Sequence, residues 1–142
     1  MIVVDTNVVS ELMRPSPSAP VTDWVRTRAR TELYTASITL AEILYGIGRL
    51  PDGRRKEFLR TTASEIFEEF KDHVLPFDIG AAVHYADVVG GRDRLGLPID
   101  GFDAQIAAIC RTHEAALATR NIKGFQYTGV DLIDPWLPPI SP

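Results

Sequence analysis

Short apolar segments rich in β-branched residues alternate along this chain with longer segments that have the spacing of helices. Strands and helices that alternate in this way build βαβ units with parallel strands. With 142 residues and 45% hydrophobic content, the chain can bury one core, so we expect a single domain over residues 1–142. The sequence thus predicts an α/β fold with a mainly parallel central sheet. The expected strands cover residues 2–4, 33–36, 73–77, 116–118 and 130–133.

Proline and glycine mark where the expected helices end. The Pro/Ser-rich segment 15–20 ends the first helix, and a second helix is expected to begin near Val21. Further helices are expected over residues 53–72, 79–89 and 104–110, with breaks at Gly90-Gly91 and at residues 96–98.

The charge balance limits the partners of the chain. Fifteen Lys and Arg against nineteen Asp and Glu give a net charge of −4, which argues against tight non-specific binding to nucleic acid. Any nucleic-acid partner must therefore be held by a local basic patch. The sequence has no signal-like segment and no apolar run of the roughly 18 residues that a membrane span needs, so we expect a soluble protein with no membrane partner. Cys110 has no disulfide partner, which favours the cytoplasm.

Two acidic residues stand where expected strands end and helices begin. Asp5 follows the first strand directly, and Glu42 lies at the start of the helix after the second strand. Each has a structural explanation, because Asp5 can bind local backbone N–H groups and Thr39 with Glu42 has the capping-box spacing. The alternative is that both point into a cleft, since ligands of parallel sheets bind beyond the carboxyl ends of the strands.

Asp100 and Asp103 form the third acidic position. Asp100 is expected to cap the helix that follows, whereas Asp103 should lie beside the packed face of that helix, which favours a functional role. If Asp5, Glu42 and Asp103 converge, they repel one another and their pKa values rise, unless a hard cation binds between them. The sequence therefore predicts a site for Mg²⁺, for which Mn²⁺ can substitute.

The order of these motifs along the chain resembles that of a known family. The motifs are Asp5-Thr6-Asn7, Thr39 with Glu42, Asp103 with the apolar residues after it, residues 117–121 and residues 129–136. Together they resemble the PIN-domain ribonucleases, most closely the VapC- and FitB-type toxins of toxin–antitoxin pairs. The resemblance implies a PIN-like three-layer sandwich. It also implies a toxin of a type II system that hydrolyses RNA phosphodiester bonds with bound Mg²⁺ or Mn²⁺.

The resemblance also implies roles for individual residues. Asp5, Glu42 and Asp103 would be the catalytic residues and the metal ligands. The polar residues that would hold these carboxylates, a metal-bound water or the scissile phosphate are Thr6, Asn7, Thr119 and Asn121. One departure concerns Gly124, which stands where family members often have a fourth acid. We therefore expect one firmly bound ion, and a second ion that depends on the substrate phosphate or on Asp100.

Two groups of basic residues could contact RNA. Arg92, Arg94, Arg120 and Lys123 are favoured, because they lie near the expected cleft. The second group, Arg49, Arg54, Arg55, Lys56 and Arg60, is more typical of the solvated face of a helix.

Expected partners follow from the resemblance as well. It implies a homodimer and a cognate antitoxin whose C-terminal segment blocks the acidic cleft, commonly with an arginine. A carboxylate cluster suits this role, because guanidinium pairs with carboxylates in a bidentate way. Contact with operator DNA is expected only indirectly, through the antitoxin.

Other functions remain open from the residues. A catalytically weakened PIN-like domain that only binds an antitoxin or RNA is favoured by Gly124 and opposed by the three acids. An aspartyl-phosphate mechanism would also use an acid after the first strand, although Asn7 stands where such phosphatases need a second aspartate. Serine, cysteine and phosphate-loop chemistry have little support, because no matching motif is present and Cys110 lies in an apolar helix.

Overall fold

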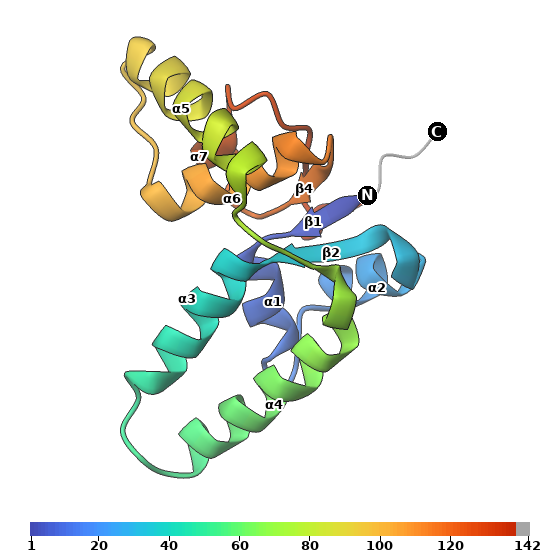
Figure 1. Ribbon diagram of the computed structural model, residues 1–142. Coiled ribbons are helices and arrows are strands. Elements are labelled where there is room, and N and C mark those ends of the chain that lie inside the picture. The colour runs from blue at the N-terminus through green and yellow to red at the C-terminus, as the bar shows by residue number, and fades with distance from the viewer. Residues whose placement is uncertain (139–142) are drawn as a thin grey trace.

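Five parallel strands form the central sheet of the computed structural model, which describes residues 1–138 (Figure 1). The strand order is β3-β2-β1-β4-β5, and every neighbouring pair is parallel. The central strand β1 pairs with β2 on one side and with β4 on the other. All carboxyl ends therefore lie at the same edge of the sheet. The strands are β1 (Ile2–Val4), β2 (Leu33–Ala36), β3 (Val74–Leu75), β4 (Ala116–Ala118) and β5 (Leu132–Ile133).

Helices cover both faces of this sheet, as Figure 1 shows, with α1 to α4 on one side and α5 to α7 on the other. The predicted mainly parallel α/β sandwich in three layers is thus confirmed. No helix within residues 1–138 has the length and apolar character needed to cross a membrane. The helices are α1 (Thr6–Leu12), α2 (Ala19–Arg26), α3 (Ser37–Gly48), α4 (Arg54–Phe70), α5 (Ile79–Arg94), α6 (Gly101–Thr112) and α7 (Ile122–Phe125).

The side chains of β1 pack into two separate hydrophobic clusters, one on each face of the sheet. Val3 packs into the cluster under α5 and α6, whereas Val4 packs into the cluster under α1 to α4. In β4, Leu117 and Ala118 divide in the same way. Successive side chains of a strand point to opposite faces, so a strand covered on both sides has to be apolar throughout. This is why the strands are short continuous apolar runs in the sequence.

The predicted break at Gly90-Gly91 is wrong, because α5 continues through both glycines to Arg94. A glycine inside a helix costs only about 1 kcal/mol relative to alanine, and packing can outweigh that cost. The Arg94 side chain lies over Gly90, where an added Cβ would come within 3.4 Å of its guanidinium. The break at residues 96–98 is confirmed, and Gly96 has a positive φ of 70° there.

Candidate active site

Asp5 lies at the carboxyl end of the central strand and begins helix α1. Its Oδ1 accepts a hydrogen bond of 2.8 Å from the backbone N–H of Thr6, and its own backbone N–H donates to Ala118 O at 2.9 Å. The side chain is therefore a helix cap, as one of the two sequence interpretations holds. It is also 4% exposed and lines a cleft at the carboxyl edge of the sheet. The capping role and a position in the cleft are thus compatible.

Polar residues that follow β1 and β4 hold the second oxygen of Asp5. Thr119 donates its hydroxyl to Asp5 Oδ2 at 2.7 Å, and Asn7 Nδ2 donates to the same oxygen at 3.4 Å. Asn7 Nδ2 and the backbone N–H of Asn121 both donate to the Thr119 hydroxyl oxygen, at 3.1 and 3.0 Å. Because Thr119 is itself buried, this network sets the orientation of the Asp5 carboxylate.

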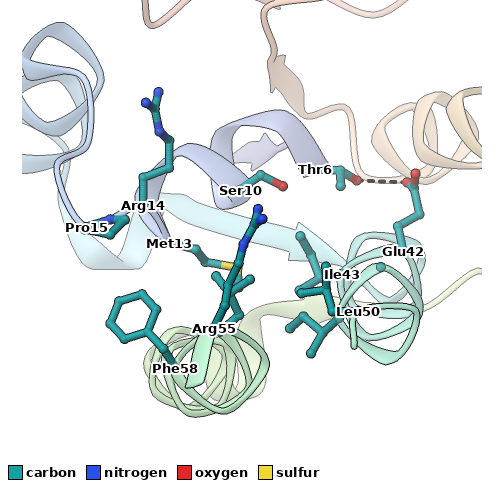
Figure 2. Close-up of a pocket in the computed structure, with 13 residues that line it drawn as sticks. Thr6, Ser10, Met13, Arg14, Pro15, Glu42, Ile43, Leu50, Arg55 and Phe58 are labelled. Atoms are coloured by element: carbon teal, nitrogen blue, oxygen red, sulfur yellow. Dashed lines mark hydrogen bonds between the residues drawn. The ribbon is translucent and has the colours of Figure 1, made fainter. Parts of the chain in front are cut away.

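Glu42 reaches the same cleft from α3, and Thr6 holds it there. The Thr6 hydroxyl donates to Glu42 Oε1 at 2.9 Å, as Figure 2 shows. It therefore accepts from the Thr39 hydroxyl, which lies 3.1 Å away. The predicted capping box is wrong, because α3 begins at Ser37, directly after β2, and Thr39 is already inside the helix. The side chains of Thr39 and Glu42 are thereby free to face α1.

Asp103 and Asp100 lie at the start of α6. Asp100 caps the helix as predicted, since its Oδ1 accepts from the backbone N–H groups of Phe102 and Asp103 at 2.9 and 3.4 Å. Asp100 is exposed and does not line the cleft, whereas Asp103 is half-buried and does. The two acids of this motif therefore have different surroundings.

The acids of the cleft have raised pKa values, because they are partly buried and repel one another. Burial raises the pKa of Asp103 to about 7, and the charges of Asp5, Asp100 and Glu42 add to this rise, while only Arg92 opposes it. Burial also raises the pKa of Asp5 and of Glu42, although hydrogen bonds from Thr119 and Thr6 oppose this. Such a site binds protons tightly, and it would bind another cation for the same reason.

The donor set suits a hard divalent cation, since it consists of carboxylate oxygens held by hydroxyl and amide groups. Within residues 1–138, no three His, Cys, Asp or Glu side chains converge closely enough to enclose an ion by themselves. Water would have to complete the coordination of any bound ion. Magnesium is usually held in this way, by one or two carboxylates and several waters.

The cleft has a volume of about 660 Å³ and gathers charged side chains of both signs. The residues that line it are Asp5, Thr6, Asn7, Ser10, Glu11, Arg14, Glu42, Arg55, Asp103, Arg120, Asn121 and Trp136.

Comparison with known proteins assigns this arrangement to a family. The PIN domain model matches residues 2–129, which is most of the chain. The chain belongs to the PIN-domain family. The resemblance predicted from the ordered motifs is therefore confirmed.

Relatives of this PIN domain lie among the toxins. It is 37% identical to VapC ribonuclease Y4jK of Sinorhizobium fredii over 97% of this chain and 99% of the relative. It is 34% identical to the toxin FitB of Neisseria gonorrhoeae over 96% of this chain and 99% of the relative. A solved structure of FitAB bound to an IR36 DNA fragment matches with a TM-score of 0.92 and 33% identity, over 99% of both chains. Within its family, the PIN domain thus belongs with the VapC and FitB toxin ribonucleases of type II toxin–antitoxin systems.

The structure brings most of the predicted site residues of the PIN domain together. Asp5, Glu42 and Asp103 share the cleft with Thr6, Asn7 and Asn121, and Thr119 lies buried beneath them. Their catalytic and metal-binding roles stay predictions.

The basic residues are arranged differently from the prediction. Arg120 lines the cleft, but exposed Arg94 and Lys123 do not. The predicted RNA contact of Arg92 is wrong. Its side chain is buried, and its guanidinium donates to backbone carbonyls on either side of it, including those of Leu97 and Gln126 at 2.6 and 2.7 Å.

Residues to which the sequence assigns no role in the site also line the cleft. The sequence pattern groups Arg55 with the solvated arginines of its helix, yet Arg55 lines the cleft together with Arg14, Glu11 and Trp136. No local pattern distinguishes Arg55 from its neighbours on the charged helix. Only the packing of α4 against α3 shows which arginine faces α1.

The Asn121 side chain occupies the space that a side chain at position 124 would fill. The Asn121 side chain caps α7 by accepting from the Gly124 backbone N–H at 3.2 Å. A Cβ at position 124 would overlap the side-chain amide of Asn121. An acid at position 124 would therefore have to displace Asn121 from its capping position.

The raised pKa values predict how stability depends on pH. Asp103 binds its proton more tightly in the folded state, where its pKa is about 7, than in the unfolded state, where it is 3.8. Between these values the folded state holds more protons, so the free energy of unfolding falls as the pH rises. In metal-free buffer we expect Tm to be lower at about pH 8 than at about pH 5.5, and to differ less in Asp103→Asn. A Tm that rises over this range would contradict the prediction.

Proposed function

We propose that this PIN domain, taken as one unit over residues 1–142, is a metal-dependent endoribonuclease that acts as the toxin of its type II system. The observation that supports this most directly is the meeting of Asp5, Glu42 and Asp103, from three separate elements, in one cleft with raised pKa values. Natural folding does not favour mutually repelling carboxylates without a compensating function, so perturbed acids in a cleft indicate a working site. We place the protein in the cytoplasm, where its RNA substrate is found.

Asp5, Glu42 and Asp103 would hold Mg²⁺, or Mn²⁺ in its place, together with waters, because the three carboxylates do not enclose an ion by themselves. When bound, such an ion activates water as a nucleophile and stabilises negative charge on the phosphate and the leaving oxygen. The residues around it have positioning roles. Thr119 and Asn7 fix the orientation of Asp5, and Thr6 fixes that of Glu42. The amide of Asn121 lines the cleft beside them and can donate to the scissile phosphate.

The test is cleavage of a panel of structured RNAs, including transfer and ribosomal RNA, by the antitoxin-free protein with Mg²⁺, with Mn²⁺ and with EDTA. Cleavage that needs the metal and is lost in Asp5→Asn supports the proposal. If no RNA is cut and calorimetry detects no bound metal, the proposal fails. The chain would then be a weakened PIN-like domain that binds only its antitoxin or RNA.

We propose one tightly bound ion, because Gly124 supplies no fourth carboxylate. A second ion would depend on the substrate phosphate or on Asp100. Titration of the RNA-free protein with Mg²⁺ is expected to give a stoichiometry near one. In Gly124→Asp we expect a lower Tm, because the new side chain must displace the Asn121 cap. Two equally tight sites in the parent protein would contradict this.

The cognate antitoxin is proposed to block the cleft with its C-terminal segment. An apolar groove of about 640 Å³ between α1, α3 and α4 supports this (Figure 2), since it shares Thr6, Glu42 and Arg55 with the acidic cleft. An apolar peptide lying in the groove could place an arginine among the carboxylates. Contact with operator DNA would be made through the antitoxin. Co-purification with the antitoxin, and its loss when the C-terminal segment is removed, would test this.

A homodimer is proposed from exposed apolar side chains on α3 and α5. Leu44 and Tyr45 are 52% and 68% exposed, and Ile79 and Val83 are 86% and 65% exposed. Large apolar side chains that are exposed to water on a helix can mark a contact surface. The double variant Ile79→Glu, Val83→Glu is expected to weaken the dimer at least about thirtyfold, which light scattering after gel filtration can measure. Phe58→Glu, at an apolar site in the groove that is 47% exposed, should remain dimeric.

A further inference from the structure

The cleft carries a set of basic side chains that the catalytic proposal does not use. We infer that Arg14, Arg55 and Arg120 bind the phosphates of a single RNA strand that crosses the acidic cleft, with Arg120 held in place by Trp136. This inference rests on the proposed ribonuclease function, and it identifies the substrate-binding surface of the same site.

An RNA strand can bind in this cleft only if cationic side chains contact its phosphates, because the other charged residues of the lining are acidic. Its lining carries four carboxylates, from Asp5, Glu11, Glu42 and Asp103, which repel an RNA backbone. The three guanidinium groups come from three different places: Arg14 follows α1, Arg55 lies in the first turn of α4, and Arg120 follows β4. The three arginines partly offset the four carboxylates of the lining, and they supply the cationic contacts that a phosphate backbone requires.

Arg55 is free to meet a phosphate. Its neighbours on α4 are engaged in ion pairs, Lys56 with Asp52 at 3.3 Å and Arg60 with Glu57 at 2.9 Å. No ion pair within residues 1–138 involves Arg55. Figure 2 shows its side chain extended from α4 towards α1, away from the helix that carries it. An extended, unpaired guanidinium at the edge of an acidic cleft is suited to an anion that passes along that cleft.

Arg120 and Arg14 are held in fixed positions. The Arg120 guanidinium lies 5.1 Å from the centre of the Trp136 ring, and its backbone N–H donates to Asn7 Oδ1 at 3.3 Å. A guanidinium that lies over an indole ring has fewer conformations in the free protein, so it loses less entropy when it binds. Arg14 is paired with the buried carboxylate of Glu11 at 3.2 Å. Both arginines are therefore ordered before RNA arrives.

The arginines stand on both sides of the acids. Glu42 and Arg55 belong to elements on the β2 side of the central strand, whereas Arg120 follows β4 on the other side. A strand that contacts both Arg55 and Arg120 must pass over Asp5, which lies at the end of β1 between them. The cleft has a volume of about 660 Å³, within the range of pockets that hold small molecules, and the nucleotides of an unpaired strand can enter such a cleft with their bases and phosphates accessible to its side chains.

The test measures RNA binding without cleavage. A short fluorescein-labelled single-stranded RNA is titrated with the antitoxin-free protein in EDTA, at several salt concentrations, and its anisotropy is followed. We expect Arg55→Gln and Arg120→Gln each to weaken binding roughly fivefold to tenfold, and to reduce the dependence of log K on log salt by about 0.7. Arg54→Gln is the matched control with the same loss of charge, because Arg54 is exposed, lies next to Arg55 and does not line the cleft. It should stay within about twofold.

Three results would overturn the inference: absence of binding by the parent protein, equal weakening by Arg54→Gln and Arg55→Gln, or an unchanged salt dependence in both cleft variants. These results are distinct from failure of the proposed function. If the parent protein cuts RNA with metal while Arg55→Gln binds normally, the basic surface is wrong and the nuclease stands. If the arginine variants lose binding but no RNA is ever cut, the surface stands and the nuclease proposal fails.

Discussion

Asp103→Asn is expected to lower the rate of metal-dependent RNA cleavage by at least about a hundredfold, since replacing even an outer partner of a metal ligand costs about 10- to 100-fold. Asparagine keeps the size of the side chain and its place in the first turn of α6, but it removes the negative charge that would hold the cation. The variant should fold well, because the charge of Asp103 is repelled by Asp5, Asp100 and Glu42. Loss of activity can thus be separated from loss of structure.

The measurement compares initial cleavage rates at saturating Mg²⁺ with the metal affinity obtained by calorimetry. Asp87→Asn is the matched control, since Asp87 is exposed on α5 and does not line the cleft. We expect the control to retain the parent rate. If Asp103→Asn cuts RNA at the parent rate, Asp103 is not a catalytic residue, whatever the effect of the substitution on metal affinity.

Arg92→Met is expected to lower the free energy of unfolding by about 3 kcal/mol and Tm by about 10 °C. Arg92 joins two segments beside the cleft. Its Nε donates to Leu97 O at 2.6 Å in the loop before α6, and its Nη1 donates to Gly124 O and Gln126 O at 3.0 and 2.7 Å. Methionine fills much of the same volume but leaves these carbonyls without a donor. An unsatisfied buried polar group costs about 1–3 kcal/mol.

Chemical denaturation measures this effect. Arg94→Met is the matched control on the same helix, because Arg94 is exposed, and it should change the stability by less than about 0.5 kcal/mol. A loss of less than about 1 kcal/mol in Arg92→Met would mean that water can replace the guanidinium and that the arginine does not tie the two segments together.

The class of fold could be predicted because its evidence is local. An apolar strand such as residues 2–4 is recognised from adjacent residues, since burial on both faces requires a continuous apolar run. The cap at Asp100 is equally local, because its oxygen binds N–H groups only two and three residues away. The break at Gly90-Gly91 was predicted wrongly, because propensity alone cannot weigh the packing of α5 against α6.

The acids of the site could also be predicted, for a topological reason. Parallel strands have their carboxyl ends at one edge, so residues after β1 and β2 meet there whatever their separation in the sequence. Asp5 and Glu42 are brought together in this way, and Asp103 joins them from the first turn of α6. The sequence could not show which polar groups hold these acids in position. One of them is the hydroxyl of Thr6, which hydrogen-bonds to both Glu42 and Thr39.

The arginines mark the boundary between what the sequence determined and what only the tertiary structure decided. The sequence determined the order of strands and helices, the caps and the acidic edge, because these depend on neighbours along the chain or on the common direction of the strands. In the sequence, Arg55 appears as an arginine of a charged helix, and Arg92 as an arginine of a loop near the expected cleft. The packing of α4 turned Arg55 towards the cleft, and the packing of α5 buried Arg92 among carbonyls. The role of a long charged side chain depends on groups distant in the sequence, so it was decided only when the chain folded.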